Sequence, residues 1–411
     1  MTNYLLFGLF AATLLGIARF HKYALPIAVS GLCLVILTKV SMVSGFSLTG
    51  HLHHEAKTIL NLGGLLLGFA VLANYFERSN VPEKLTEVLP AGRLGAFLLL
   101  VLVAVMSSVL DNIAAALIGG AAAITLFQRK VHVGYLAAIV AASNAGGAGS
   151  VVGDTTTTMM WIDGVAAMDV VEAALGSLVA VAFFGYFASI QQHKLQPLVK
   201  ATHATKPIDF ASVGLVLLIL VAAIVTNITL ELPAAGVWGA ILAGALLRKP
   251  DWQVVKPAAV GACFLLSLVL SASMMPVESL PPAGPGTVAG LGVVSAFFDN
   301  IPLTALAINQ GGYDWGFLAF CVGYGGSMLW FGSSAGVAIS GLFPEAKSAK
   351  NWLVSGWHVA VGYVLGFVVM LLLLGWHPHA PHKKAQGGAE HGVVEPGQVD
   401  LGAAEHSKPM R

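Results

Sequence analysis

Two pairs of neighbouring polar residues interrupt long apolar segments of the chain, Asp111-Asn112 and Asp299-Asn300. A carboxylate can bind a cation or take up a proton, and an Asn side chain offers both a carbonyl oxygen and an amide donor. An ionisable group in hydrocarbon is costly, so it is retained where it faces a watery cavity or takes part in ion or proton transfer. We therefore expect both pairs to bind ion or substrate, with Asp111 and Asp299 as candidates for carrying a proton.

Two glycine-rich stretches form a second pair of candidate sites. Residues 144–154 read Asn-Ala-Gly-Gly-Ala-Gly-Ser-Val-Val-Gly-Asp, and residues 323–333 read Gly-Tyr-Gly-Gly-Ser-Met-Leu-Trp-Phe-Gly-Ser. We expect each stretch to unwind the middle of a membrane-spanning helix, where irregular backbone is tolerated if it lines a cavity. After the first stretch a helix restarts with Asp154 or the next residue as its cap, and the hydroxyls of Thr157 and Thr158 are expected to bond back to their own helix. The candidate binding residues of both stretches are Asn144, Gly146, Gly147, Gly153, Asp154, Thr155, Gly325, Gly326, Gly332, Ser333 and Ser334.

The distribution of charge around these motifs favours a cation. No Lys or Arg occurs in residues 94–128, 131–193 or 257–346, so an anion would depend on helix N-termini, neutral polar groups and co-bound cations. A cation finds carboxylates instead. Asp154 is matched by Ser333 in the second stretch, and two nearly equivalent sites that differ by one carboxylate could separate a proton site from an ion site.

The composition indicates whether these polar groups lie in a soluble or a membrane protein. Of 411 residues, 57% are hydrophobic and 10% are charged, whereas soluble domains carry about 25% charged residues. This excludes a soluble enzyme, a disordered protein and, with a net charge of +1, a nucleic-acid binder. The three cysteines have neither disulfide nor zinc spacing. We expect an all-α polytopic membrane protein without catalytic residues or cofactor, whose partners are the lipid bilayer and a small ion or small molecule.

The apolar pattern predicts ten membrane-spanning stretches of the length a helix needs, roughly 20 residues. They lie near residues 3–20, 24–45, 58–76, 133–163, 165–190, 209–228, 235–248, 257–276, 313–342 and 352–376. Residues 93–127 and 288–308 are also apolar, but the Asp-Asn pairs divide each into two short arms. We interpret these two segments as re-entrant helical hairpins whose tips are buried in protein or face water.

The basic residues set the expected orientation. With the N-terminus outside and both hairpins returning to the side they enter, the inside loops hold 15 of the 17 Lys and Arg residues that precede residue 377, as the positive-inside rule requires. We therefore expect a multi-pass protein of the bacterial inner membrane with both termini outside. His51, His53 and His54 are expected in an outside loop.

The same arrangement of spans, hairpin and broken helix occurs twice along the chain. Asp299-Asn300 follows Asp111-Asn112 by 188 residues, and the second glycine-rich stretch follows the first by 179 residues. Each half has five spans, so the second half must be inverted, and inverted repeats with interrupted helices are typical of secondary transporters. The expected organisation is a first repeat over 1–190 (hairpin 93–127, broken helix 133–163), a cytoplasmic linker over 191–208, a second repeat over 209–376 (hairpin 288–308, broken helix 313–342) and a disordered tail over 377–411.

These motifs resemble the ion transporter superfamily, which includes NhaD-type sodium/proton antiporters, arsenite permeases, and citrate and dicarboxylate/sodium symporters. The resemblance runs from about residue 58 to residue 376. Residues 144–158 are similar to the antiporter pattern, in which Asn-Ala-Gly-Gly is followed by Gly-Asp and a run of Thr. Dicarboxylate carriers have Ser-Asn-Thr at the tips, a motif that binds sodium and substrate carboxylate, and here the Asn alone matches at both tips. The resemblance implies scaffold and transport domains, a homodimer and an elevator motion.

The leading hypothesis is a secondary active sodium (or lithium)/proton antiporter. Asn112, Asp154 and Asn300, with the unwound backbone, would hold the ion, and Asp111, Asp154 and Asp299 are the candidates for carrying the proton. A sodium-coupled citrate or dicarboxylate carrier and an arsenite permease remain as alternatives. The inverted repeat argues against a membrane scaffold or receptor without transport activity.

Overall fold

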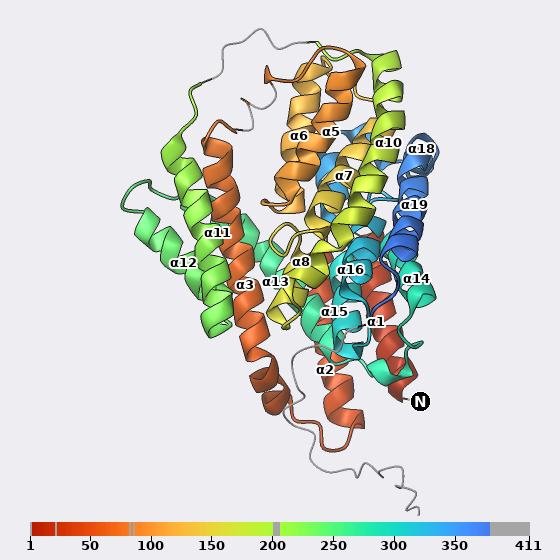
Figure 1. The fold of residues 1–411 in the computed structure, drawn as a ribbon. Helices are drawn as coiled ribbons and strands as arrows, with labels where there is room; N and C mark the ends of the chain where they lie inside the picture. Colours follow the sequence, from red (N-terminus) through yellow and green to blue (C-terminus); the bar gives the residue numbers. More distant parts are fainter. Residues whose placement is uncertain (1, 21–22, 82–83, 85–86, 200–205, 379–411) are drawn as a thin grey trace, which may run out of the picture.

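The computed structural model describes residues 2–378 except 21–22, 82–83, 85–86 and 200–205, and across these residues it is helical without strands (Figure 1). Most of the predicted tail, residues 379–411, lies outside the described residues. Together with the apolar composition, this architecture is that of a polytopic membrane protein.

The helices lie in the predicted apolar segments, but five or six of them, rather than ten, are long and apolar enough to span a membrane among the described residues. In the first half they are α1 (Thr2–Arg19), α2 (Ala24–Met42), α3 (Leu48–Arg78), α5 (Arg93–Ser107), α6 (Asn112–Leu126), α7 (Val133–Ala148), α8 (Thr155–Ile162), α9 (Ala167–Val171) and α10 (Ala173–Leu195). In the second half they are α11 (Phe210–Leu230), α12 (Pro233–Gly244), η2 (Trp252–Val254), α13 (Val255–Ser273), η3 (Val277–Ser279), α14 (Pro285–Ser295), α15 (Asn300–Gln310), α16 (Trp315–Leu318), the π-helix η4 (Ala319–Tyr324), α17 (Ser334–Leu342), η5 (Pro344–Lys347), α18 (Ala349–Ser355) and α19 (Trp357–Leu373).

Five helices of the described chain are long and apolar enough to cross a bilayer individually: α2, α3, α9 with α10, α11, and η2 with α13. A sixth span is formed if α18 and α19, which are bent by 60° relative to each other, are counted together. The remaining apolar helices, among them α5, α6, α7 and α14, have 10–17 residues. Helices this short cannot cross about 30 Å of hydrocarbon alone, so they depend on their neighbours for shielding.

The helices pack in two groups. The first group contains α1, α2, α3, α11, α12 and α13, in which α3 packs on α11, α12 and α13. The second group contains α5 to α10 and α14 to α19, and α7 lies inside it against α5, α6, α10 and η4. Almost every residue of α7 is buried. The groups meet where α13 packs on α15 and where α3 packs on α8, and Figure 1 shows α3 and α11 to one side of the second group.

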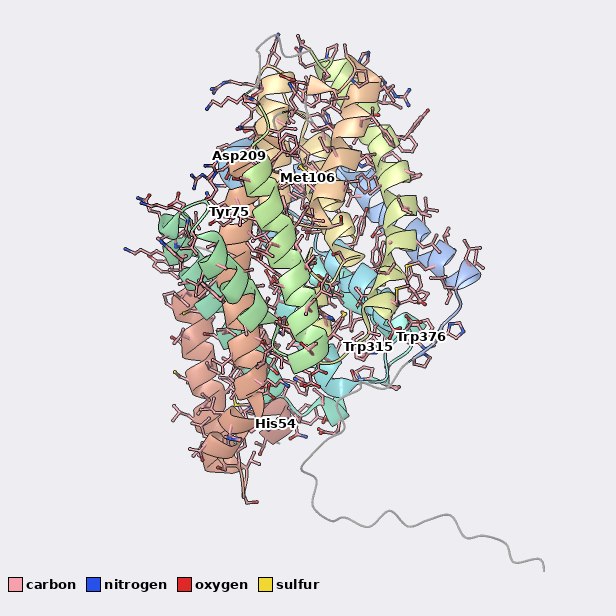
Figure 2. The ribbon with its side chains drawn as sticks, turned by 60° about the vertical axis from the view of Figure 1, so that its left-hand side comes forward. His54, Tyr75, Met106, Asp209, Trp315 and Trp376 are labelled. Carbon is pink, nitrogen blue, oxygen red and sulfur yellow. The ribbon has the colours of Figure 1, made fainter. Side chains whose placement is uncertain are left out.

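Helix α3 extends beyond the predicted span. Its 31 residues correspond to about 46 Å, which exceeds the hydrocarbon thickness, and Figure 2 shows His54 near the lower end of the molecule and Tyr75 in its upper half. The Ser47 side chain caps the helix by accepting from Gly50 N. The expected outside loop at His51, His53 and His54 is therefore wrong, because these residues belong to the first turns of α3.

The boundary between the predicted repeats also differs from expectation. Helix α10 continues to Leu195, so the first five residues of the predicted linker 191–208 are helical. The amide side chain of Gln192 explains this extension, because it accepts from His132 N and donates to the carbonyl of Lys130. These bonds tie the end of α10 to the start of α7.

Candidate functional site

The first Asp-Asn pair lies where α5 is followed by α6. The chain turns between Ser107 and Asn112, and Asp111 occupies the N-cap position of α6 without making a capping hydrogen bond. Asn112 is buried and its Nδ2 donates to Asn144 Oδ1 over 3.0 Å. The pair is thus divided: the amide is held in the protein interior, whereas the Asp111 side chain lines a cavity.

The second pair lies between α14 and α15 and is bonded differently. Asp299 caps α15, with Oδ1 accepting from Ile301 N over 3.1 Å. Its Oδ2 accepts from the Ser334 hydroxyl over 3.1 Å. Both carboxylate oxygens of Asp299 are therefore engaged, and Pro302 in the first turn of α15 costs no backbone hydrogen bond.

The first glycine-rich stretch breaks later than expected. Asn144, Gly146 and Gly147 lie within α7, which ends at Ala148, so the prediction that the whole stretch is unwound is wrong for these residues. A Cβ on Gly146 would lie 1.9 Å from the carbonyl oxygen of Ala104 in α5. This glycine therefore allows two helices to approach closely, which is a packing role.

The irregular backbone is confined to residues 149–154. Asp154 is buried and caps α8, with its Oδ1 accepting from Thr156 N over 3.2 Å. As expected, the hydroxyls of Thr157 and Thr158 bond locally, and both donate to the carbonyl of Asp154 over 2.9 Å. Each also donates to a carbonyl of the preceding turn, that of Ser150 or Val151.

The second stretch breaks in the same part of its helix. Helix α16 passes into the π-turn η4, the chain is irregular from Gly326 to Gly332, and Ser333 caps α17 by accepting from Gly336 N over 3.3 Å. A Cβ on Gly325 would lie 2.1 Å from the carbonyl oxygen of Gly292 in α14. Here too a predicted binding glycine allows close packing of backbones.

The tips and the breaks meet in the interior of the second group. Asn144 Nδ2 donates to the Ser327 hydroxyl over 2.9 Å and to the Ser333 hydroxyl over 3.1 Å. Asn300 Nδ2 lies 3.4 Å from Asp154 Oδ2. Each bond joins the first half of the chain to the second, and all five side chains are at most 2% exposed.

Sequence reasoning did not single out two buried residues of this interior. The Ser327 hydroxyl accepts from Asn144. The sequence feature that could have identified it is a hydroxyl residue directly after Gly325-Gly326, where the first stretch has alanine. Thr156 is fully buried beside Asp154, and its hydroxyl has no hydrogen-bond partner of good geometry among the described residues. The sequence feature that could have identified Thr156 is its place in a run of four Thr.

A cavity of about 440 Å³ lies between the two groups of helices. The side chains of Asp111, Asp154, Thr155 and Thr158 line it from the second group, and apolar residues of α3 and α13 form the opposite wall. None of the described residues that line it is Lys, Arg or His. The cavity therefore offers two carboxyl groups and two hydroxyls against hydrocarbon, a surface suited to a small cation or a proton.

The Asp299 carboxylate lines a different cavity. Asp299 and Ser334 line a smaller cavity of about 170 Å³ together with Phe297, Phe298 and Phe331. The three predicted proton candidates are thus divided between two cavities. Among the described residues, no three His, Cys, Asp or Glu side chains gather into a metal-holding cluster, so a bound cation would combine carboxylate with neutral oxygens.

Comparisons with known proteins identify the family of the chain. A family model described as citrate transporter matches residues 6–323. Sodium/proton antiporter 1 of Arabidopsis thaliana is 30% identical over 327 residues, which cover 68% of this chain and 56% of the relative. Sodium/proton antiporter 2 of the same plant is 28% identical over 281 residues, which cover 56% of this chain and 66% of the relative.

The chain thus spans only part of the length of either relative, 56% and 66%. The family match covers far more than half of the chain, and the apolar helices agree with a membrane location. The chain is accordingly that of a multi-pass membrane protein, and it belongs to the citrate transporter family within the ion transporter superfamily.

Proposed function

We propose that this transporter is a secondary active sodium (or lithium)/proton antiporter. The observation that carries the proposal is the buried Asp154 carboxylate, which contacts Asn300 and lines a cavity without a basic side chain among its described residues. A carboxylate that holds either a cation or a proton, but not both, couples their movement in opposite directions. Sodium would bind at Asn112, Asp154 and Asn300, and the proton would be carried by Asp111, Asp154 or Asp299.

The proposed architecture consists of two inverted repeats, with re-entrant hairpins at 93–127 and 288–308 and broken helices at 133–163 and 313–342. The lengths of α5, α6, α14 and α15 support the hairpins, since none exceeds 15 residues. Equivalent contacts support the repeat. Gly146 approaches Ala104 just as Gly325 approaches Gly292, and these residues are related by the same offsets of 179 and 188 positions.

The proposed motion is of the elevator type. Every candidate site residue belongs to the second group of helices or its connecting segments, whereas the first group supplies only apolar walls to the two cavities. This division supports a mobile transport domain that slides along a fixed scaffold. We propose that the scaffold also forms a homodimer and that the protein lies in the bacterial inner membrane with both termini outside.

The test uses purified protein in liposomes with an imposed pH gradient and an internal pH-sensitive dye. Sodium or lithium should collapse the gradient, whereas potassium should not. Asp154→Asn should abolish this exchange, because the amide cannot take up a proton, while the variant still folds. Ser340→Ala serves as a matched control, since the Ser340 hydroxyl bonds only within its own helix. Full exchange by Asp154→Asn would remove Asp154 from the mechanism.

The description of the matching family favours a second candidate, a sodium-coupled carrier of citrate or a dicarboxylate. In that case labelled citrate would accumulate in the liposomes only with sodium, and no proton flux would accompany it. The anion would have to bind at the Asn112 and Asn300 tips with sodium as its counter-charge, because the sequence holds no Lys or Arg between residues 257 and 346.

A further inference from the structure

Residues at equivalent positions in the two halves of the chain contact the opposite half. The side chains at these positions differ, so the contacts of the first half are not repeated by the second. Asn144 of the first half contacts Ser327 and Ser333 of the second. The position equivalent to Asn144, 179 residues later, is Gly323, and a Cβ built there would lie 3.3 Å from Asp154 Oδ2.

The remaining neighbours of these positions also correspond. The Gly323 Cβ would lie 3.5 Å from the Cβ of Ala148, which is the equivalent of Ser327, and 3.8 Å from the hydroxyl oxygen of Thr156, which is the equivalent of Ala335. The molecule therefore contains two related polar positions, one beside Ser333 and one beside Asp154.

The position beside Ser333 is filled by the protein itself. The amide nitrogen of Asn144 donates to two hydroxyl oxygens, and its carbonyl oxygen accepts from Asn112. A donor nitrogen between oxygen atoms occupies the place that a small cation would take. Because Asn144 is fully buried and both ends of its amide are bonded, a cation could enter only at the cost of these bonds.

The position beside Asp154 also has an amide nitrogen nearby, since Asn300 Nδ2 lies 3.4 Å from Asp154 Oδ2, but it differs in three ways that favour a cation. The amide is replaced by Gly323, which has no side chain, the Ser333 hydroxyl is replaced by the Asp154 carboxylate, and the methyl of Ala335 is replaced by the Thr156 hydroxyl. The Thr156 hydroxyl is fully buried and has no hydrogen-bond partner of good geometry among the described residues. This hydroxyl approaches the Asp154 carboxylate in a hydrogen bond of poor geometry, and a cation between the hydroxyl and the carboxylate would replace this weak contact.

We infer that the transporter has one cation site per chain, at Asp154 and Thr156, and that the missing side chain at Gly323 makes room for the ion, while the Asn144 amide closes the equivalent site. This inference rests on the proposed function and narrows its sodium ligands: Asp154 and Asn300 lie beside the site, whereas Asn112 bonds Asn144 at the closed position. Gly323 becomes a determinant of ion size, since a methyl group there would narrow the site without meeting backbone atoms.

The first experiment measures binding of radioactive sodium to purified wild-type protein in detergent, without any proton gradient. Saturation at one sodium per chain is expected, and saturation at two would overturn the inference. Because binding is measured in the absence of transport, a protein that binds one sodium but exchanges no protons would count against the proposed function and leave the site intact.

The second experiment compares three variants in the same assay. Gly323→Ala should weaken sodium binding by about ten-fold, the loss of roughly one charge-assisted contact, and should weaken lithium binding less because lithium is smaller. Gly323→Asn should abolish binding, because its amide would repeat the role of Asn144. Gly341→Ala is the control, since nothing lies within 4 Å of a Cβ there.

Near-ultraviolet circular dichroism and thermal unfolding should be measured for each variant to check that it is folded. A folded Gly323→Ala protein with unchanged affinity for both ions would contradict the assignment, and so would a folded Gly323→Asn protein that still binds sodium. Thr156→Val should also weaken sodium binding, whereas Thr156→Ser, which keeps the hydroxyl, should restore it. A merely structural role of Thr156 would not require the hydroxyl for binding.

Discussion

At the scale of single residues, the site depends on amide and hydroxyl groups as much as on carboxylates. Asn144 makes three side-chain hydrogen bonds. Its carbonyl oxygen accepts from Asn112, and its amide nitrogen donates to the hydroxyl oxygens of Ser327 and Ser333. In an apolar interior each such bond stabilises the fold chiefly because breaking it leaves a buried polar group unpaired. The same groups that shape the site therefore also stabilise the contact between the halves of the chain.

Ser327→Ala tests this contact. The substitution removes one of the two acceptors of Asn144 Nδ2 at a fully buried position, so we expect the free energy of unfolding to fall by about 1–2 kcal/mol. Thermal unfolding in detergent, followed by tryptophan fluorescence, measures the change. Ser340→Ala removes a hydroxyl that bonds one turn back along its helix and should change the midpoint far less. Equal effects of the two substitutions would show that the Asn144 contact adds nothing specific.

At the scale of helices, the first group is tied together at one end by a bidentate ion pair. Arg248, just after α12, donates to both carboxylate oxygens of Asp209, over 3.2 and 3.3 Å. Asp209 also caps α11 and donates its N–H to the carbonyl of Ser79. The Tyr75 hydroxyl of α3 donates to the carbonyl of Arg248, and Figure 2 shows Tyr75 and Asp209 at the same end of the molecule.

This arrangement predicts a pH dependence of stability. The Arg248 hydrogen bonds, followed by that of Ser212, lower the pKa of Asp209 below its usual value of 3.8. A carboxyl group whose pKa is lowered by folding stabilises the native state above its unfolded pKa and loses this contribution as the pH falls through its folded pKa. Asp209→Asn should therefore be less stable than wild type at neutral pH, with the difference shrinking only below about pH 4.

Thermal unfolding of both proteins between pH 3 and pH 7 measures this difference. Asp251→Asn is a matched control, because Asp251 also caps a helix, through Gln253 N, but has no ion pair among the described residues. A difference between wild type and Asp209→Asn that is the same at every pH would contradict the ion-pair explanation.

At the scale of the whole molecule, the two ends carry different charged contacts. Lys57 in α3 pairs with Glu231 at the end of α11, whereas Arg248 pairs with Asp209 at the start of α11. Helix α11 has 21 residues, about 32 Å, which matches the hydrocarbon thickness. The two ion pairs thus lie at opposite ends of α11, and from the positive-inside rule we expect the Arg248 end to face the cytoplasm.

Thiol labelling tests this orientation. In a cysteine-free background, His54→Cys should react with a membrane-impermeant maleimide in intact spheroplasts, because His54 is exposed near the end of α3 that we expect outside. Lys249→Cys, exposed beside Arg248, should react only after the membrane is permeabilised. The opposite pattern would invert the proposed topology and place both termini inside.

Much of the architecture follows from local sequence patterns. The apolar segments predicted helices within a few residues of those observed, because each needs only its own length and hydropathy to be recognised. The N-terminal boundary of α3 was not predicted. His51, His53 and His54 are polar, but they belong to the first turns of a helix that is longer than the hydrocarbon thickness. The glycines at 146 and 325 were assigned to binding because their sequence signal does not distinguish an unwound helix from a closely packed one.

The sequence by itself determined that this is a helical membrane protein with carboxylates and no basic residues in its central segments. The tertiary structure alone decided which groups meet: Asn144 with Ser333, 189 positions away, and Asp154 with Asn300, 146 positions away. It also separated Asp299 from the cavity shared by Asp111 and Asp154. The physical reason is that hydropathy and capping act within one helix, whereas these contacts depend on how helices from both halves pack against each other.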